Sequence, residues 1–195
     1  MRFIFKTDYA QDIQLVKHGG QAFWYGLLML AMLSAPWWAG DYWLSQISFV
    51  LIYSVAGLGL MVLSGFTGLA SIGHAAFLGV GAYVQAVLSG YGWPFPLTMA
   101  LAAGLSAAVG MVVGLPALRV KGIYLAIATL SFGFIVEEVL ARWESVTGGN
   151  AGLMVKPVVW LGYRWSSPES FYYLTFALAL LASTAGFLWL RRGLV

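Results

Sequence analysis

The sequence contains no cysteine and few charged residues. The absence of cysteine excludes disulfide bonds and thiolate metal sites, and it leaves the redox compartment undefined. Only 9% of the residues are charged, compared with about 25% in soluble domains, whereas 61% are hydrophobic. So few polar groups cannot cover the surface of a water-soluble domain of this length. The composition, with a mean hydropathy of +0.85, therefore predicts an integral membrane protein.

Motifs for phosphate binding and catalysis are also absent. The pattern GxxxxGK(S/T) does not occur, so the chain has no phosphate loop, and its serine, histidine and acidic residues form no triad-like group. The two histidines, His18 and His74, have no cysteine or carboxylate at a spacing that would complete a metal site. A net charge of +3 fits membrane orientation better than nucleic-acid binding. We therefore expect no catalytic residues, no metal and no cofactor.

Six long apolar stretches account for most of the chain. A helix needs about 20 apolar residues to cross the hydrocarbon core of a bilayer. Helices are expected because backbone polar groups in lipid must be paired within the segment, and the runs are too long and too continuous for barrel strands. We predict an all-α, polytopic transmembrane helix bundle of about six spans. The spans are expected at residues 22–38, 43–63, 66–88, 96–118, 123–141 and 171–190.

The segments outside these stretches define the domain organisation. Residues 1–20 are polar and of mixed charge, which excludes a cleavable signal and predicts a cytoplasmic tail ahead of one transmembrane domain, 21–195. Ser64–Gly65 predicts a tight inner turn. The long segment 145–170 is expected outside, and the β-type residues in Val155–Trp165 predict a short extended piece within it.

The basic residues predict the orientation. With the N-terminus inside, seven of them lie on the inner side and three on the outer side, as the positive-inside rule requires. The inner ones are Arg2, Lys6, Lys17, Arg119, Lys121, Arg191 and Arg192, and the outer ones are Arg142, Lys156 and Arg164. Trp43, Trp93 and Trp143 lie at predicted outer ends, where an aromatic belt is expected.

Residues 65–88, GFTGLASIGHAAFLGVGAYVQAVL, are rich in glycine and alanine. Small residues allow helices to pack closely in lipid, and glycine also permits a break in a spanning helix that lines a cavity. Both interpretations stay open. As helix-packing residues we predict Gly68, Gly73, Gly79 and Gly81, together with Gly110 and Gly114 of a GxxxG pattern in the next stretch.

Three polar residues within the apolar stretches are candidates for a substrate pathway. His74 lies about 12 Å into its stretch, where it either faces a cavity or bonds a backbone carbonyl as a neutral histidine. Glu137 and the adjacent Glu138 are about 100° apart on a helix, so they cannot both face one direction. Thr129, Gly133 and Glu137 share one helical stripe, which suits a helix interface or a translocation path. Both glutamates equally suit the end of a helix. The candidates are His74, Thr129 and Glu137.

Three blocks of residues resemble the branched-chain amino acid ABC transporter permeases. They are GLASIGHAAFLGVGAY at 68–83, RVKGIYLAIATL at 119–130 and TGGNAGL at 147–153. They keep the family's order and spacing, and the last two resemble the LivM-type subunit in particular. The resemblance implies a permease subunit of an ATP-driven importer for branched-chain or related amino acids, with urea or amides as the alternative substrates.

The resemblance also implies partners and a location. The partners are a homologous LivH-type permease, two cytoplasmic ATPase subunits and an extracytoplasmic substrate-binding protein, in the bilayer of a bacterial or archaeal cytoplasmic (inner) membrane. Family members continue past the position of Val195, which implies truncation of this chain at its C-terminus. From the residues alone, an ion-coupled secondary transporter and a purely structural subunit stay open, and the two glutamates are the residues that keep the secondary transporter open.

Overall fold

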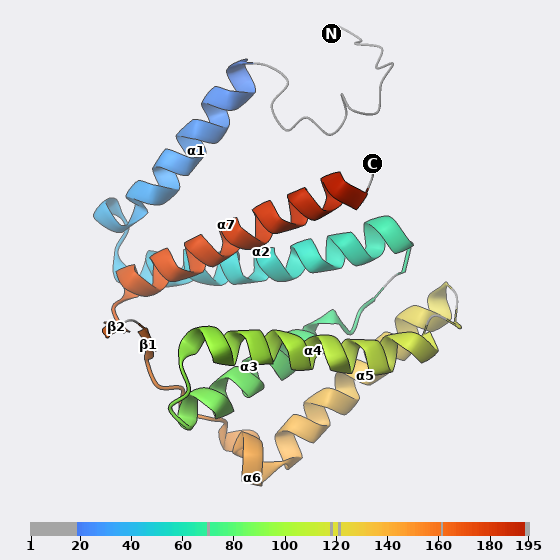
Figure 1. Cartoon of the computed structure of the whole chain (residues 1–195). Coiled ribbons are helices and arrows are strands. Elements are labelled where there is room, and N and C mark those ends of the chain that lie inside the picture. Colours follow the sequence, from blue (N-terminus) through green and yellow to red (C-terminus); the bar gives the residue numbers. More distant parts are fainter. Residues whose placement is uncertain (1–18, 70, 118, 121, 161, 194–195) are drawn as a thin grey trace, which may run out of the picture. The chain divides into compact units, whose positions relative to one another are not determined.

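The computed structural model describes residues 19–69, 71–117, 119–120, 122–160 and 162–193 (Figure 1). The chain divides into two compact units, which are described separately. The first comprises Met1–Ile52 and Pro168–Val195, and the second comprises Tyr53–Ser167. Of the predicted cytoplasmic tail, residues 1–18 lie outside the described ranges, and the last two residues already belong to the first helix.

The described residues are almost entirely helical, which confirms the predicted all-α architecture. The helices are α1 (Gly19–Trp38), α2 (Asp41–Thr67), α3 (His74–Gly90), α4 (Phe95–Ala117), α5 (Ile123–Arg142), the short α6 (Glu144–Thr147), the 3-10 turn η2 (Gly149–Ala151) and α7 (Pro168–Gly193). Strands β1 (Val158–Trp160) and β2 (Tyr163–Trp165) form an antiparallel hairpin in which Val159 lies opposite Arg164. The hairpin confirms the predicted extended piece.

Four of the described helices are long and apolar enough to cross a membrane. They are Asp41–Gly65, Phe95–Pro116, Ile123–Arg142 and Pro168–Trp189. These segments coincide with four of the predicted spans. Helix α1 occupies the place of the first predicted span and α3 that of the third, but α3 has only 17 residues. At 1.5 Å per residue it reaches roughly 25 Å, which is less than the hydrocarbon thickness of about 30 Å.

The third predicted span begins later than expected. Helix α2 continues through the predicted turn at Ser64–Gly65, and Gly68 ends it with a φ of +66° and an N–H bond to the Ser64 carbonyl at 3.1 Å. The backbone then leaves the helical path, and the Ile72 N–H donates to Thr129 Oγ1 of α5 at 3.1 Å. Residues 66–88 are therefore not one helix, because the backbone bonds to α5 before α3 starts at His74.

In the first unit, a tyrosine of α7 compensates for a proline in α1. Pro36 has no N–H, so the Met32 carbonyl four residues earlier lacks its helical donor. The Tyr172 hydroxyl donates to that carbonyl at 2.7 Å, and Tyr173 donates to the neighbouring Leu33 carbonyl at 3.2 Å. Tyr172 is fully buried. These bonds connect α1 to α7 and satisfy backbone groups that lipid cannot satisfy.

Replacing Tyr172 by phenylalanine should lower the free energy of unfolding by about 1–3 kcal/mol, because the Met32 carbonyl is left without a donor. Tyr173→Phe is the matched control and should have a smaller effect, since Tyr173 is partly exposed. In a Pro36→Ala background the Met32 carbonyl regains its helical donor. Tyr172→Phe should therefore lower the free energy of unfolding by less in that background. Denaturant unfolding in detergent micelles measures all four variants. An equal cost of Tyr172→Phe in both backgrounds would contradict this account.

Candidate functional site

In the second unit, small residues allow α3 to approach both α4 and α5. Toward α4, a Cβ added to Gly81 would lie 3.1 Å from Ser106 Oγ, and the Ser106 hydroxyl donates to the Phe77 carbonyl at 3.1 Å. A Cβ on Gly110 of α4 would lie 3.7 Å from the Phe77 ring. Toward α5, a Cβ on Gly79 would lie 3.6 Å from a methyl group of Leu140. The two faces of α3 thus contact different helices.

The closest approach is at Gly73, directly before α3. A Cβ at this position would lie 1.9 Å from the Thr129 carbonyl oxygen, a distance that no side chain can adopt. A Cβ added to Gly133, one turn further along α5, would lie 3.6 Å from the Gly73 Cα. The Thr129 hydroxyl accepts the Ile72 N–H and donates to the Ala126 carbonyl at 3.0 Å. The start of α3 is therefore held against α5 by one close contact and one hydrogen bond.

Two of the predicted packing glycines do not make such contacts. A Cβ at Gly68 or Gly114 would meet nothing within 4 Å among the residues that the structure describes. Gly68 instead ends α2 in the left-handed conformation, which a glycine adopts without strain. In the GxxxG pattern of α4, Gly110 but not Gly114 faces a neighbouring side chain among the described residues.

After α5, the chain folds back in a tight turn that contains the TGGNAGL block. The buried Thr147 hydroxyl donates to the Leu140 and Trp143 carbonyls at 2.6 and 2.8 Å, and it accepts the Gly149 N–H at 3.2 Å. Three glycines in the turn have positive φ angles, namely Gly148 (+73°), Gly149 (+57°) and Gly152 (+71°). This arrangement places η2 against the end of α5.

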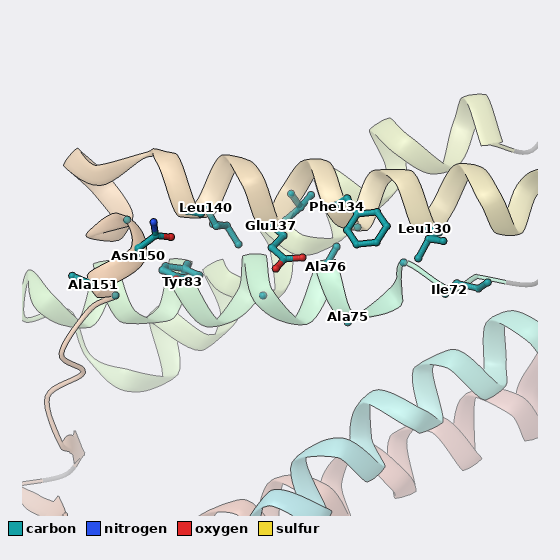
Figure 2. A pocket seen from close by; sticks show the side chains of 17 residues that line it. Ile72, Ala75, Ala76, Tyr83, Leu130, Phe134, Glu137, Leu140, Asn150 and Ala151 are labelled. Atoms are coloured by element: carbon teal, nitrogen blue, oxygen red, sulfur yellow. The ribbon is translucent and has the colours of Figure 1, made fainter.

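A cavity of about 570 Å³ lies between α3, α5 and this turn (Figure 2). Its walls are mostly small or apolar, and its three polar side chains are Tyr83 of α3, Glu137 of α5 and Asn150 of η2. Figure 2 shows the Glu137 carboxylate between the two helices near Ala76, with Tyr83 and Asn150 further along toward the turn. No basic side chain is among the described residues that line the cavity.

The two adjacent glutamates have different surroundings, as their separation on the helix predicts. Both side chains are exposed, but Glu138 forms an ion pair with Arg142, one turn further along α5. Glu137 lines the cavity, and no ion pair joins it to another residue in the described ranges. Of these two glutamates, one carboxylate is therefore paired on the helix surface, and the other has no ion pair among the described residues.

Of the three pathway candidates, only Glu137 lines the cavity. Thr129 uses its hydroxyl at the contact with Ile72. The His74 ring lies 6.1 Å from the Phe77 ring, and its Nε2 lies 3.4 Å from where a Cβ on Gly59 would be. Its Nδ1 is buried without a hydrogen-bond partner among the described residues.

Sequence reasoning missed two residues that line the cavity, Tyr83 and Asn150. The signal that could have found them is their position in the family-like blocks: Tyr83 is the last residue of the first block, and Asn150 lies in the centre of TGGNAGL.

These features define a polytopic α-helical membrane protein with a polar group inside a helix-lined cavity. The chain belongs to the family described as the permease component of the branched-chain amino acid transport system, which matches residues 42–194. The family and the apolar helices together identify a multi-pass protein of the cytoplasmic (inner) membrane.

Two curated proteins are similar to this chain. The high-affinity branched-chain amino acid transport system permease protein LivM of Salmonella typhimurium strain LT2 is 44% identical over 108 residues. The protein of the same description from Escherichia coli strain K12 is 42% identical over 108 residues. Each match covers 55% of this chain and 25% of the relative, so the chain matches about a quarter of the length of these relatives. No solved structure shows a significant match.

Replacing Gly73 by alanine should destabilise the second unit by about 1–3 kcal/mol or more, because the new methyl group would force α3 and α5 apart. Gly114→Ala is the matched control. It adds a methyl group in open space within a helix, so it should be neutral or should stabilise by about 0.5–1 kcal/mol. Denaturant unfolding of the purified protein measures both. Equal stabilities of the two variants would show that the contact at Gly73 is not required.

Proposed function

We propose that this chain is a permease subunit of an ATP-driven importer of branched-chain or related amino acids. The family match over residues 42–194 carries the proposal. The similar LivM proteins are described as permeases of high-affinity branched-chain amino acid transport. A mostly apolar cavity with a few polar groups suits a small solute that has one polar end and one apolar end.

In this proposal the chain acts with partners and is not itself an enzyme. A homologous LivH-type permease completes the membrane pathway, an extracytoplasmic binding protein delivers the substrate, and two cytoplasmic ATPase subunits hydrolyse ATP. The division of labour agrees with the absence of a phosphate-loop pattern from these 195 residues.

The proposed path of the substrate follows the cavity between α3 and α5, with Glu137 as its charged residue. The Thr129 hydroxyl accepts the Ile72 N–H just before α3, and the His74 ring packs edge-on against the Phe77 ring. If the N-terminus lies inside, as the basic residues predict, the end of the cavity near Asn150 faces outward. The substrate would then enter from the side on which the binding protein docks.

Uptake into proteoliposomes distinguishes this function from ion-coupled transport, which a carboxylate within a membrane helix also suits. The intact complex is reconstituted with its ATPase subunits facing the lumen and with the binding protein outside. We expect labelled leucine to accumulate when the lumen contains ATP, and not when it contains a non-hydrolysable analogue. Uptake driven by a sodium or proton gradient without ATP would contradict the proposal.

A further inference from the structure

We propose that the cavity between α3 and α5 recognises the ammonium group of an amino acid through Glu137, while its small apolar walls receive the amino acid's side chain. This inference rests on the proposed function and deepens it, because it separates amino acids from the neutral alternatives, urea and amides. Three observations carry it: the charge at Glu137, the composition of the cavity walls and the contrast with Glu138.

The Glu137 carboxylate is accessible to a cation in the cavity. Glu137 lies five residues before the end of α5 at Arg142, or roughly 7 Å into the helix. A carboxylate within a membrane helix usually faces the protein interior or a water-filled cavity and pairs with an opposite charge. The Glu137 side chain is exposed where it lines the cavity, so a molecule there can contact the carboxylate. Among the described residues that line the cavity none is basic, and Arg142 is paired with Glu138. A cation that enters the cavity can therefore pair with Glu137 without displacing an existing partner among the described residues.

The cavity also fits the remainder of an amino acid. Its volume of about 570 Å³ lies within the range of roughly 300–1,000 Å³ that small-molecule sites occupy. Ala75, Ala76 and Gly79 of α3 and Gly133 of α5 line the cavity, and these residues have a methyl group or no side chain, so they occupy little of its space. Leu140 adds apolar surface beside Glu137 (Figure 2). Tyr83 and Asn150 supply a hydroxyl and an amide near the turn, where they can bond the polar groups of a ligand.

A neutral ligand would leave the carboxylate uncompensated. Urea and simple amides can donate hydrogen bonds to Glu137, but they bring no positive charge. Hydrogen bonds to charged groups contribute more than neutral ones, and a site built around such a bond strongly rejects a ligand that cannot form it. The cavity should therefore prefer ammonium compounds with an apolar chain.

Direct binding to the intact importer complex, measured without the binding protein, tests this inference. The probe is labelled leucine, and the competitors are isoamylamine, which keeps the ammonium group, and 4-methylpentanoate, which keeps only the carboxylate. We expect isoamylamine to displace leucine, and 4-methylpentanoate, urea and acetamide not to displace it. Equal displacement by isoamylamine and 4-methylpentanoate would overturn the inference.

Three substitutions complete the test. Glu137→Gln preserves shape and removes the charge, so it should weaken leucine binding roughly ten- to a hundred-fold. Glu137→Asp should retain part of the affinity. Glu138→Gln, which removes the neighbouring carboxylate outside the cavity, should bind leucine as the unsubstituted protein does. Unchanged binding in Glu137→Gln would overturn the inference.

One further outcome identifies a different occupant of the cavity. If Glu137→Gln releases another subunit from the complex, the carboxylate pairs with a basic side chain of that subunit, and the inference fails. The proposed function is judged separately by the unsubstituted complex. Its ATP-driven leucine uptake, together with a failed Glu137 test, would refute only the ammonium site, whereas the absence of ATP-driven uptake would refute the proposed function.

Discussion

The second unit depends on the absence of a side chain at Gly73. The Thr129 carbonyl oxygen lies where a Cβ would otherwise be, at 1.9 Å, so the chain can pass α5 at this point only as glycine. The hydrogen bond from the Ile72 N–H to Thr129 Oγ1 orients the backbone at this contact. From here α3 runs along α5 until the turn after α5 closes the other end, and the cavity with Glu137 lies between these two constraints. The geometry of the site therefore follows from backbone contacts more than from polar side chains.

Both units meet the same requirement of a lipid environment, which is that every backbone polar group needs a partner within the protein. In the first unit, the proline of α1 leaves the Met32 carbonyl without its helical donor, and Tyr172 replaces that donor. In the second, the Ile72 N–H leaves the helical path and bonds Thr129 Oγ1 instead. In both of these cases a polar side chain from another helix supplies the missing partner, and the bond joins two helices.

Hydropathy predicted the helices well because lipid demands long apolar segments, but it could not locate the break before α3. Residues 65–88 contain several glycines that look alike in sequence, and only contact with α5 distinguishes Gly73 from Gly68. The same limit applies to the site. The sequence predicted that Thr129, Gly133 and Glu137 share one face of a helix. It did not predict that Thr129 bonds the Ile72 N–H before α3, whereas Glu137 lines the cavity. Asn150 lines the same cavity as Tyr83 because the turn after α5 folds back, and hydrophobic periodicity in the sequence does not predict this turn.

The proposed substrate path depends on a water-accessible cavity between α3 and α5. Because the sequence contains no cysteine, the accessibility of this cavity can be measured with single introduced cysteines. Val136 and Ile135 are neighbours on α5 at nearly the same depth; Val136 lines the cavity, whereas Ile135 is exposed outside it. The measurement is the rate at which single-cysteine variants Val136→Cys and Ile135→Cys in the intact membrane-embedded complex react with a small, charged, water-soluble thiol reagent. The account predicts rapid modification of Val136→Cys, slowed by leucine, and little modification of Ile135→Cys. Equal reactivity of the two, or a reactive Ile135→Cys beside an inert Val136→Cys, would contradict it.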